Sequence, residues 1–317
     1  MSKRTLTAEA GRSLDRPASP ILNELKNNWM VYLMFLPVAV YYICFIFKPM
    51  YGALIAFQNY VPAKGMMGSQ WVGFKHFIDF FNNHYFVRIL KNTLVISFAS
   101  IIFGFPMPII MALLLNEIKG SFFKRTVQTI SYIPHFISLV VICGMIKTFT
   151  ASNGIITQMI VALGGSDVSI LSNPDAFVPM YIISDIWQNV GWDSIIYLAA
   201  LTGINQELYE AATIDGANRW QQTIHVTLPG IAPTIIILLI LRLGSVLGLG
   251  YEKIILLYNE MTRETADVIS SFVYRKGLLE MSWSYSSAVG LFNSVVNFIM
   301  IILTNAVSRK VTDTSLW

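Results

Sequence analysis

Six long apolar runs limit most strongly what this chain can fold into. Of its 317 residues, 55% are hydrophobic and only 13% are charged, and the mean hydropathy is +0.58. A soluble domain carries about 25% charged residues, and a helix needs ~20 apolar residues to cross a bilayer. The composition therefore predicts an all-α membrane protein with six transmembrane helices. The expected spans are residues 29–47, 94–115, 130–149, 177–201, 231–249 and 285–307.

The cations outside these runs predict the orientation of the spans. Residues 1–28 hold five Lys or Arg and residues 116–129 hold three, whereas residues 150–176 hold none. Because Lys and Arg gather in cytoplasmic loops, we expect both termini to be cytoplasmic, together with loop 202–230. The outer segment 250–284 departs from this rule. Its cations are Lys253, Arg263, Arg275 and Lys276.

This topology divides the chain into three parts. We expect a polar N-terminal tail over residues 1–28, one membrane domain over residues 29–308 and a short C-terminal tail over residues 309–317. The N-terminal tail has no short apolar core before a small-residue cleavage site, so we expect no cleaved signal there.

The remaining composition argues against several kinds of site. The net charge of +4 comes without a basic stripe and interleaved aromatic residues, so no nucleic-acid binding is expected. Cys44 and Cys143 both fall within predicted spans, where we expect small core residues rather than a disulfide. The four histidines have no acidic partner at ligand spacing, so no metal site is expected.

The polar segment between the fourth and fifth runs has the pattern of a short surface helix followed by a turn. Asn205 is placed to cap this helix, and Glu207 and Glu210 follow, where carboxylates favour the helix dipole. Small alanines give the helix a low apolar strip that lets it lie close to another surface. Gly216 is then expected to take the left-handed geometry that ends a helix. An ordinary surface helix between two spans is the alternative interpretation.

The same segment resembles the EAA loop of permease subunits in bacterial ATP-binding-cassette (ABC) importers, whose pattern is EAAxxDGA followed by a spacer and Leu-Pro. The matching residues are Glu210, Ala211, Ala212, Asp215, Gly216, Ala217, Leu228 and Pro229. In that family the loop is a cytoplasmic coupling helix docked in a groove of the ATPase. The resemblance implies that loop 203–230 couples ATP-driven motion to the membrane helices.

Further segments extend the resemblance over most of the chain. They include YGALIAFQNY (51–60), WVGFKHF (71–77), KRTVQTISYIPHF (124–136), YEKIILLYN (251–259) and SRKVTDTSLW (308–317). Together they are similar to sugar-type permeases related to the maltose importer. They look most like the subgroup that serves polysaccharide fragments, including aldouronate, pectin-derived and alginate-type importers. The particular oligosaccharide, and whether it is acidic, stays open.

The resemblance also implies a set of partners. The chain has no G-x-x-x-x-G-K-[ST] phosphate loop, so a separate ATPase dimer would bind ATP and Mg, and this chain would hold no cofactor and catalyse no reaction. A second homologous permease would form a heterodimer with it, although a homodimer stays open. An extracytoplasmic sugar-binding protein would deliver the oligosaccharide. The complex would lie among the lipids of the bacterial cytoplasmic membrane.

The fourth predicted span is rich in polar residues. One stripe of its helix consists of Asp185, Gln188, Asn189 and Trp192. A charge at mid-bilayer costs about 2.5–3.5 kcal/mol on insertion scales, so it usually lines a cavity or finds a partner. Carboxylate, amide and indole groups together suit the hydroxyls and flat ring faces of a sugar. The stripe is therefore a candidate substrate pathway, with packing against a sister subunit as the alternative.

Arg242 is the only cation expected deep in the fifth span. Counted at ~1.5 Å per residue, Arg242 and Asp185 both fall near the middle of the membrane. We expect the two side chains to form an ion pair, or both to face the cavity. Direct binding of an acidic sugar by Arg242 is the competing hypothesis.

Three more residues are candidates for the pathway. Asn293 and Asn297 share one face of the sixth span, where helix packing is the alternative. Tyr251 opens the outer segment, together with Glu252 and Lys253. In the family this segment reaches the outer face, near the docked binding protein.

An ion-coupled secondary transporter is the main alternative function. It would need titratable residues in the membrane, which Asp185 and Asp193 supply, and usually inverted repeats, which we do not find in the sequence. It would also leave the EAA-like loop unexplained. A membrane-embedded enzyme fits less well, because no paired metal ligands or nucleophile elbow lie within the spans.

Overall fold

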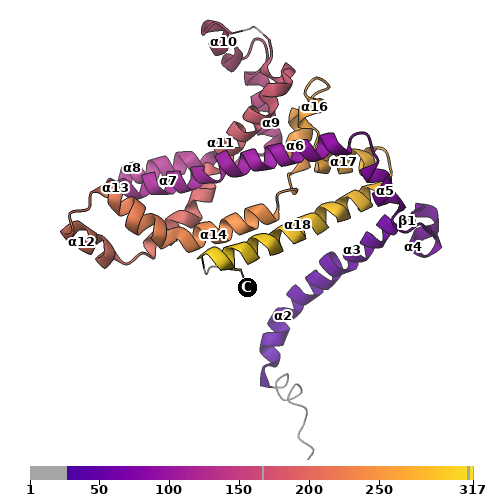
Figure 1. Cartoon of the computed structure of the whole chain (residues 1–317), viewed down its shortest axis with the longest axis horizontal. Helices are drawn as coiled ribbons and strands as arrows, with labels where there is room; N and C mark the ends of the chain where they lie inside the picture. The colour runs from indigo at the N-terminus through magenta and orange to yellow at the C-terminus, as the bar shows by residue number, and fades with distance from the viewer. Residues whose placement is uncertain (1–26, 166–167, 313–314, 317) are drawn as a thin grey trace, which may run out of the picture. The chain divides into compact units, whose positions relative to one another are not determined.

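The computed structural model describes residues 27–165, 168–312 and 315–316. The described chain is almost entirely helical, and its few strand residues form a two-stranded sheet (Figure 1). It divides into two compact units, residues 1–54 and residues 55–317.

The first predicted span is one continuous helix, Trp29–Phe57. Its parts are α2 (Trp29–Tyr41), a π-helical turn (Tyr42–Phe47), α3 (Lys48–Met50) and a 3₁₀ turn (Tyr51–Phe57). No side chain of α2 is buried within this chain, and a helix that is apolar on all sides is typical of a membrane span. Of the predicted N-terminal tail, residues 1–28, the structure describes only Asn27 and Asn28.

The second unit begins with a small hairpin that leads to a long helix. The hairpin contains β1 (Gln58–Asn59), a 3₁₀ turn (Pro62–Lys64), α4 (Gly65–Gly68) and β2 (Gln70–Trp71), with the two strands antiparallel. The helices that follow are α5 (Lys75–Phe81), α6 (Phe86–Ala99), a π-helical turn (Ser100–Gly104) and α7 (Pro106–Glu117). The helix Phe86–Glu117 begins before the predicted second span, because polar side chains in its first turns find partners in the segment 250–284.

The third predicted span is bent sharply. Its parts are α8 (Ser121–Tyr132), a 3₁₀ turn (Ile133–Phe136) and α9 (Leu139–Phe149), which lie at 97° to each other across the break. Pro134 in the 3₁₀ turn lacks the N–H that a continuing α-helix needs, and the break itself is the extended pair Ile137 and Ser138. Ser138 Oγ then accepts a hydrogen bond from Val141 N and caps α9. The third predicted span, residues 130–149, covers the end of α8 and all of α9, and it is a single span if this bent pair crosses the membrane together.

The fourth and sixth predicted spans lie within single helices, whereas the fifth ends earlier than predicted. The fourth lies in α11 (Pro174–Thr202) and the sixth in α18 (Trp283–Thr312). The fifth was predicted to reach residue 249, but α14 (Leu228–Gly244) stops at Gly244. The chain then turns through residues 245–250 into α15 (Tyr251–Leu257). Asn297 Oδ1 holds this turn by accepting a hydrogen bond from Leu247 N at 3.0 Å.

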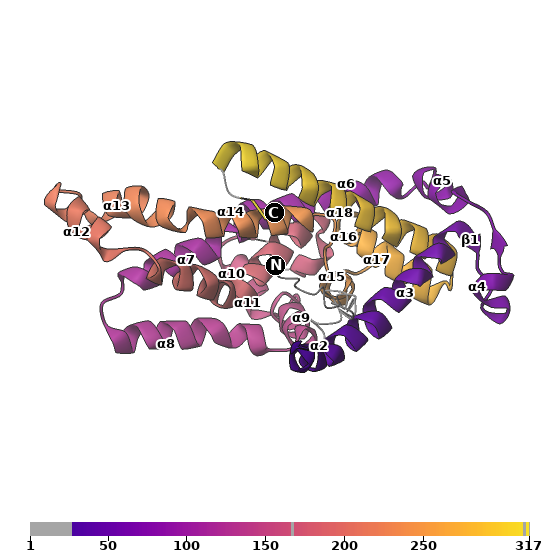
Figure 2. The ribbon, with the colours of Figure 1, turned by 90° about the horizontal axis from the view of Figure 1, so that it is seen from below.

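The remaining helices are short. They are α10 (Ile155–Ala162), a 3₁₀ turn (Ile170–Ser172), α12 (Gln206–Ile214), α13 (Arg219–Gln222), a π-helical turn (Thr223–Thr227), α16 (Arg263–Ala266), α17 (Ile269–Tyr274) and a π-helical turn (Arg275–Leu279). In both views of the second unit, α12 and α13 lie at one end, and α5 and α17 lie at the other (Figures 1 and 2).

Within the described part of the chain, four helices are long and apolar enough to cross a membrane, and the bent pair α8–α9 adds a fifth if it forms one span. The helix α11 is not among them, although it has 29 residues. Its carboxylates and amides, among them Asp185 and Asp193, make it too polar. This polarity matters, because α11 packs against α7, α8, α14 and α16 and so lies at the centre of the second unit.

Three apolar clusters hold the second unit together. The first joins α6, α9, α11 and α15 through Ile96, Cys143, Phe177, Tyr181, Ile182, Ile254 and Leu257. The second joins α5, α6, α17 and α18 through Phe80, Ile89, Ile269, Phe272 and Val289. The third joins α7, α11 and α14 through Ala112, Tyr197, Leu201 and Ile231. As predicted, Cys143 is a buried core residue, whereas Cys44 was also expected in a core and is exposed within this chain.

Each cation of the segment 250–284 has an acidic partner. The pairs are Lys253–Asp185 at 3.3 Å, Arg263–Glu260 at 3.5 Å, Arg275–Asp267 at 2.7 Å and Lys276–Glu280 at 2.5 Å. The charge rule for loops concerns Lys and Arg that hold a loop in the cytoplasm. Each of these four charges is neutralised by an acidic partner in the fold. They therefore give little reason to place the segment on the cytoplasmic side.

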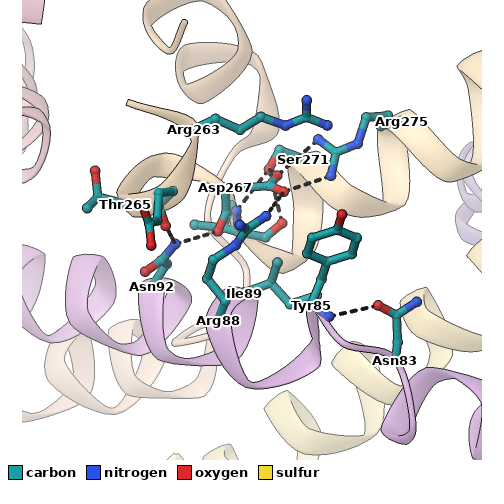
Figure 3. A network of polar contacts seen from close by, with 12 residues as sticks. Asn83, Tyr85, Arg88, Ile89, Asn92, Arg263, Thr265, Asp267, Ser271 and Arg275 are labelled. Atoms are coloured by element: carbon teal, nitrogen blue, oxygen red, sulfur yellow. Dashed lines mark hydrogen bonds and ion pairs between the residues drawn. The ribbon is translucent and has the colours of Figure 1, made fainter. Parts of the chain in front are cut away.

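Asp267 is the centre of a polar network that joins α16 and α17 to α6 (Figure 3). Its side chain is only 1% exposed and accepts hydrogen bonds from Arg275 Nη2 at 2.7 Å and from Ser271 Oγ at 2.7 Å. Arg88 of α6 lies 4.0 Å from the same carboxylate. Asn92 of α6 donates to two backbone carbonyl groups of the segment, at 2.8 and 3.0 Å.

The carboxylate and Arg275 depend on each other. Burial by itself would lower the pKa of the Arg275 guanidinium, but the hydrogen bonds and charge of Asp267 outweigh burial and raise this pKa above its usual value. Arg275 is therefore charged at every physiological pH.

We expect Asp267→Ala to destabilise the protein. It leaves Arg275 largely buried without its partner, and breaking a buried ion pair in this way costs about 3–5 kcal/mol. The melting temperature of the purified protein in detergent measures the effect. Glu260→Ala is the control, because Glu260 is 87% exposed and its pair with Arg263 is worth about 0–1 kcal/mol. Equal melting temperatures for the two variants would contradict the assignment.

Candidate functional site

A polar cavity of about 580 Å³ lies against α11. The α11 side of its wall consists of Asp185, Gln188, Asn189 and Asp193, and the opposite side includes Arg242, Ser245 and the first turn of α15. A second cavity of about 300 Å³ shares Asp185, Asn189, Asp193 and Arg242 with the first. Three of the four residues in the predicted α11 stripe therefore face one cavity.

Asp185 forms its ion pair with Lys253 rather than with Arg242. Lys253 Nζ lies 3.3 Å from Asp185 Oδ1 and donates to the carbonyl oxygen of Tyr181 at 3.3 Å. Among the described residues no ion pair links Asp185 to Arg242, so that expectation was wrong. The reason is the early end of α14, which lets α15 fold back and bring Lys253 to Asp185. Asp185 and Arg242 both line the cavity, which was the alternative expectation.

Asn189 connects the cavity wall to the bend between α8 and α9. Its amide donates to Asp185 Oδ1 at 3.3 Å, and its Oδ1 lies 3.1 Å from His135 Nδ1. The His135 ring is stacked on Trp192, with 4.6 Å between ring centres and 3° between ring planes. One face of the Trp192 indole is thus covered by His135, and the indole remains 41% exposed. His135 was not predicted as part of the site, because nothing in the run Ile133–Phe136 marks it as a partner of α11.

The other predicted pathway residues occupy different positions. Tyr251 lines the larger cavity and is stacked on Tyr274, with ring centres 5.0 Å apart. Asn297 holds the turn after α14, and Asn293 Oδ1 is buried without a hydrogen-bond partner in the described part of the chain. Neither asparagine lines the two cavities, so a role for them in the pathway stays a prediction.

The charges around the larger cavity are mixed. Its wall contains the carboxylates of Asp185, Asp193 and Glu252 and the cations of Arg242 and Lys253. Lys253 is already engaged by Asp185. Arg242 is exposed, and no ion pair of the described residues includes it. Arg242 is therefore the cation that this chain offers to an anionic ligand in the cavity.

The loop between α11 and α14 folds as its sequence predicts. Asn205 Oδ1 caps α12 by accepting a hydrogen bond from Glu207 N at 3.0 Å. Gly216 has φ of 80° and ends the helix in the left-handed region, where Ala217 N donates to the carbonyl of Ala212 at 2.9 Å. The chain then enters α13 through a capping box at Asn218.

This loop exposes apolar side chains at the end of the second unit. Leu208, Ile214 and Trp220 are 53%, 86% and 71% exposed. Between α12 and α13 lies a hollow of about 350 Å³ lined by the EAA-like residues Ala212, Asp215, Gly216 and Ala217. An ion pair of 2.7 Å between Arg219 and Glu117 ties the loop to the end of α7. A motion of the loop would therefore reach the helices around the cavity through α7, α11 and α14.

Comparisons with known proteins agree with this arrangement. Residues 104–313 match the family described as binding-protein-dependent transport system inner membrane component. The chain is 45% identical to Protein LplB of Bacillus subtilis (strain 168), over 90% of each chain. It is 44% identical to the polygalacturonan/rhamnogalacturonan transport system permease protein YteP of the same organism, over 92% of this chain and 91% of YteP.

A solved structure is similar over nearly the whole chain. It is the crystal structure of a bacterial alginate ABC transporter in complex with alginate pentasaccharide-bound periplasmic protein. One of its chains aligns with a TM-score of 0.86 and 43% identity, over 93% of this chain and 99% of that chain.

A helical membrane unit with a polar cavity and a protruding two-helix loop defines the membrane component of an importer. The chain belongs to the family of binding-protein-dependent transport system inner membrane components. It is thus a multi-pass protein of the cytoplasmic membrane and a permease subunit of an ABC importer, without a catalytic role of its own. The resemblance stated from the sequence is confirmed.

Gly191 of α11 allows α8 to approach closely, and we expect Gly191→Ala to disturb the site. A Cβ atom at this position would lie 2.2 Å from the carbonyl oxygen of Ser131 in α8, so the two helices would have to separate. Overpacking of this kind costs about 1–3 kcal/mol. We expect a lower melting temperature than for Gly144→Ala, whose added Cβ meets nothing within 4 Å. The same melting temperature for both variants would argue against close packing of α8 on α11.

Proposed function

We propose that this chain is the permease through which an ATP-driven importer moves oligosaccharides derived from anionic polysaccharides across the bacterial cytoplasmic membrane. The observation that carries the proposal is the cavity along α11, which offers carboxylates and amides to hydroxyl groups and Arg242 to an acidic group. The relatives support it, since YteP is named for polygalacturonan and rhamnogalacturonan and the similar structure is of an alginate transporter. An ion-coupled secondary transporter would leave the family match unexplained.

The proposed topology has six spans with both termini in the cytoplasm. Counting α11 as the fourth span brings the total to six, because α11 is long enough to cross a bilayer and its polar groups have a cavity to face. The membrane domain then covers residues 29–308, and residues 309–317 form the cytoplasmic C-terminal tail. In this arrangement α12 and α13 lie on the cytoplasmic side, and α5 and α17 lie outside.

Loop 203–230 is proposed to be the contact with the ATPase. Its exposed apolar side chains, and the hollow between α12 and α13, offer a surface with both shape and apolar area for a partner. The proposed contact residues are Glu210, Ala211, Ala212, Asp215, Gly216 and Ala217, with Leu228 and Pro229 at the start of α14. ATP and Mg would be bound entirely by the partner ATPase dimer.

Two further partners complete the proposed importer. An extracytoplasmic binding protein would deliver the oligosaccharide, as the periplasmic protein of the alginate transporter structure suggests. A second homologous permease would form a heterodimer and close the cavity from the other side. The exposed apolar side chains of α2, and of Trp187 and Trp192 in α11, support such a partner within the membrane.

Uptake by the complex in proteoliposomes tests the proposal. The complex is co-expressed with its ATPase and second permease, and radiolabelled uronate oligosaccharides are supplied on the binding protein. We expect uptake that needs ATP, is blocked by vanadate and survives a protonophore. Uptake that stops with the protonophore alone would instead support the secondary transporter.

Gly216→Val is expected to loosen the ATPase and reduce the ATP hydrolysis that loaded binding protein stimulates. A β-branched residue is strained at φ of 80°, whereas asparagine tolerates this region, so Gly216→Asn is the matched control. A Cβ at this position meets nothing within 4 Å, so neither variant clashes within this chain. The measurement is ATPase activity together with the amount of ATPase that co-purifies. Normal stimulated hydrolysis in the Gly216→Val complex would refute the coupling role.

Arg242→Gln is expected to lower uptake of uronate oligosaccharides about tenfold, because hydrogen bonds to charged groups are worth about 1.5–3 kcal/mol. Lys276→Gln is the control, because Lys276 pairs with Glu280 outside the cavity and its loss should leave uptake unchanged. Initial uptake rates with saturating loaded binding protein are compared. Equal rates for the two variants would rule out Arg242 as a ligand.

A further inference from the structure

Lys253 is a cation held almost entirely out of solvent at the edge of the cavity. Its side chain is 6% exposed, and its ammonium group contacts Asp185 Oδ1 and the Tyr181 carbonyl, each at 3.3 Å. The Tyr181 ring centre lies 4.7 Å from the same ammonium. A lysine ammonium has three donors and no acceptor. With two donors engaged and little exposed surface, Lys253 is poorly placed to contact a ligand itself.

The side chain of Asp185 is more exposed than that of Lys253. It is 30% exposed and lines both polar cavities. The hydrogen bonds from Lys253 and Asn189 both go to Oδ1. Oδ2 accepts no hydrogen bond from the described residues, so it is the oxygen left for a ligand. An ionised carboxylate accepts stronger hydrogen bonds than a neutral group does, and a sugar hydroxyl is a suitable donor.

Apolar contacts also hold α15 in place, beside the ion pair. Ile254 and Leu257, in the next turns of α15, are both fully buried against Phe177 and Tyr181 of α11. This apolar contact fixes the helix whether or not Lys253 is charged. A buried ion pair replaced by apolar side chains of similar size is often neutral or stabilising. The pair therefore calls for a role other than bracing α15.

We propose that Lys253 is a positioning residue that orients the Asp185 carboxylate, so that Oδ2 accepts a hydrogen bond from a saccharide hydroxyl in the cavity. This inference rests on the proposed function and deepens it. In this proposal, two parts of the cavity wall bind different groups of the saccharide. Asp185, supported by Lys253 and Asn189, receives hydroxyl groups, while Arg242 receives the acidic group.

Two variants test this role in the reconstituted complex. Lys253→Met removes the charge while keeping an apolar stem of similar length against Tyr181. The double exchange Asp185→Lys with Lys253→Asp keeps an ion pair but places the cation on the cavity side. The matched control is the exchange Lys276→Glu with Glu280→Lys, which reverses an ion pair away from the cavity. Melting temperature, ATP hydrolysis and uptake of uronate oligosaccharide per ATP are measured with saturating loaded binding protein.

We expect Lys253→Met to lower uptake per ATP about tenfold, which corresponds to the loss of one hydrogen bond to a charged group. Its melting temperature should fall less than that of Asp267→Ala, because the Asp185 side chain left unpaired is 30% exposed and the apolar contacts of α15 remain. The Asp185–Lys253 exchange should not restore uptake, whereas the control exchange should leave uptake as in the wild type.

A purely structural ion pair predicts different results. It would lower the melting temperature of Lys253→Met as much as that of Asp267→Ala, and the Asp185–Lys253 exchange would restore both stability and uptake. Either restored uptake in the exchange or unchanged uptake in Lys253→Met overturns the inference. If the wild-type complex takes up no oligosaccharide with any loaded binding protein, the proposed function itself fails and the inference falls with it. If the wild type transports and Lys253→Met matches it, only the inference fails.

Discussion

The structure depends on one constraint. The central helix of this membrane protein, α11, carries charged and amide side chains that the apolar interior of a membrane does not solvate. The helix α11 brings Asp185, Gln188, Asn189 and Asp193 into the second unit, and each such group needs a partner or a cavity. The fold supplies both. The early end of α14 lets α15 return with Lys253, Gly191 lets α8 approach, and the bend after α8 places His135 beside Asn189. The features that interrupt the regular helices are therefore those that build the site.

Local features of this fold were predictable from the sequence, because short-range physics decides them. Apolar runs placed the long helices, the Asn205 cap placed α12, and Gly216 ended it in the expected left-handed conformation. The end of α14 at Gly244 was not predictable from composition, because the apolar run continues past it to Leu249. Tertiary contacts decide this boundary.

In the candidate site, too, local features were predictable from the sequence and tertiary contacts were not. The stripe on α11 was visible because its spacing alone puts Asp185, Gln188 and Asn189 on one face, and all three line the cavity. The partner of Asp185 was not visible, because Lys253 lies 68 residues further along the chain and reaches it only through the turn after α14. Pairing of charges also shows that the four cations of segment 250–284 are matched by acidic partners. Charge counts along a sequence do not show which charges the fold neutralises.

The central claim is that the cavity along α11 is the path of the oligosaccharide, and the most direct test is to see the oligosaccharide there. The full complex, with ATPase, second permease and loaded binding protein, is trapped with ATP and vanadate and imaged by electron cryomicroscopy. The account predicts saccharide density in contact with Asp185, Asn189 and Arg242. Saccharide density in the membrane region that contacts only the second permease, with the α11 cavity closed by side chains, would contradict it.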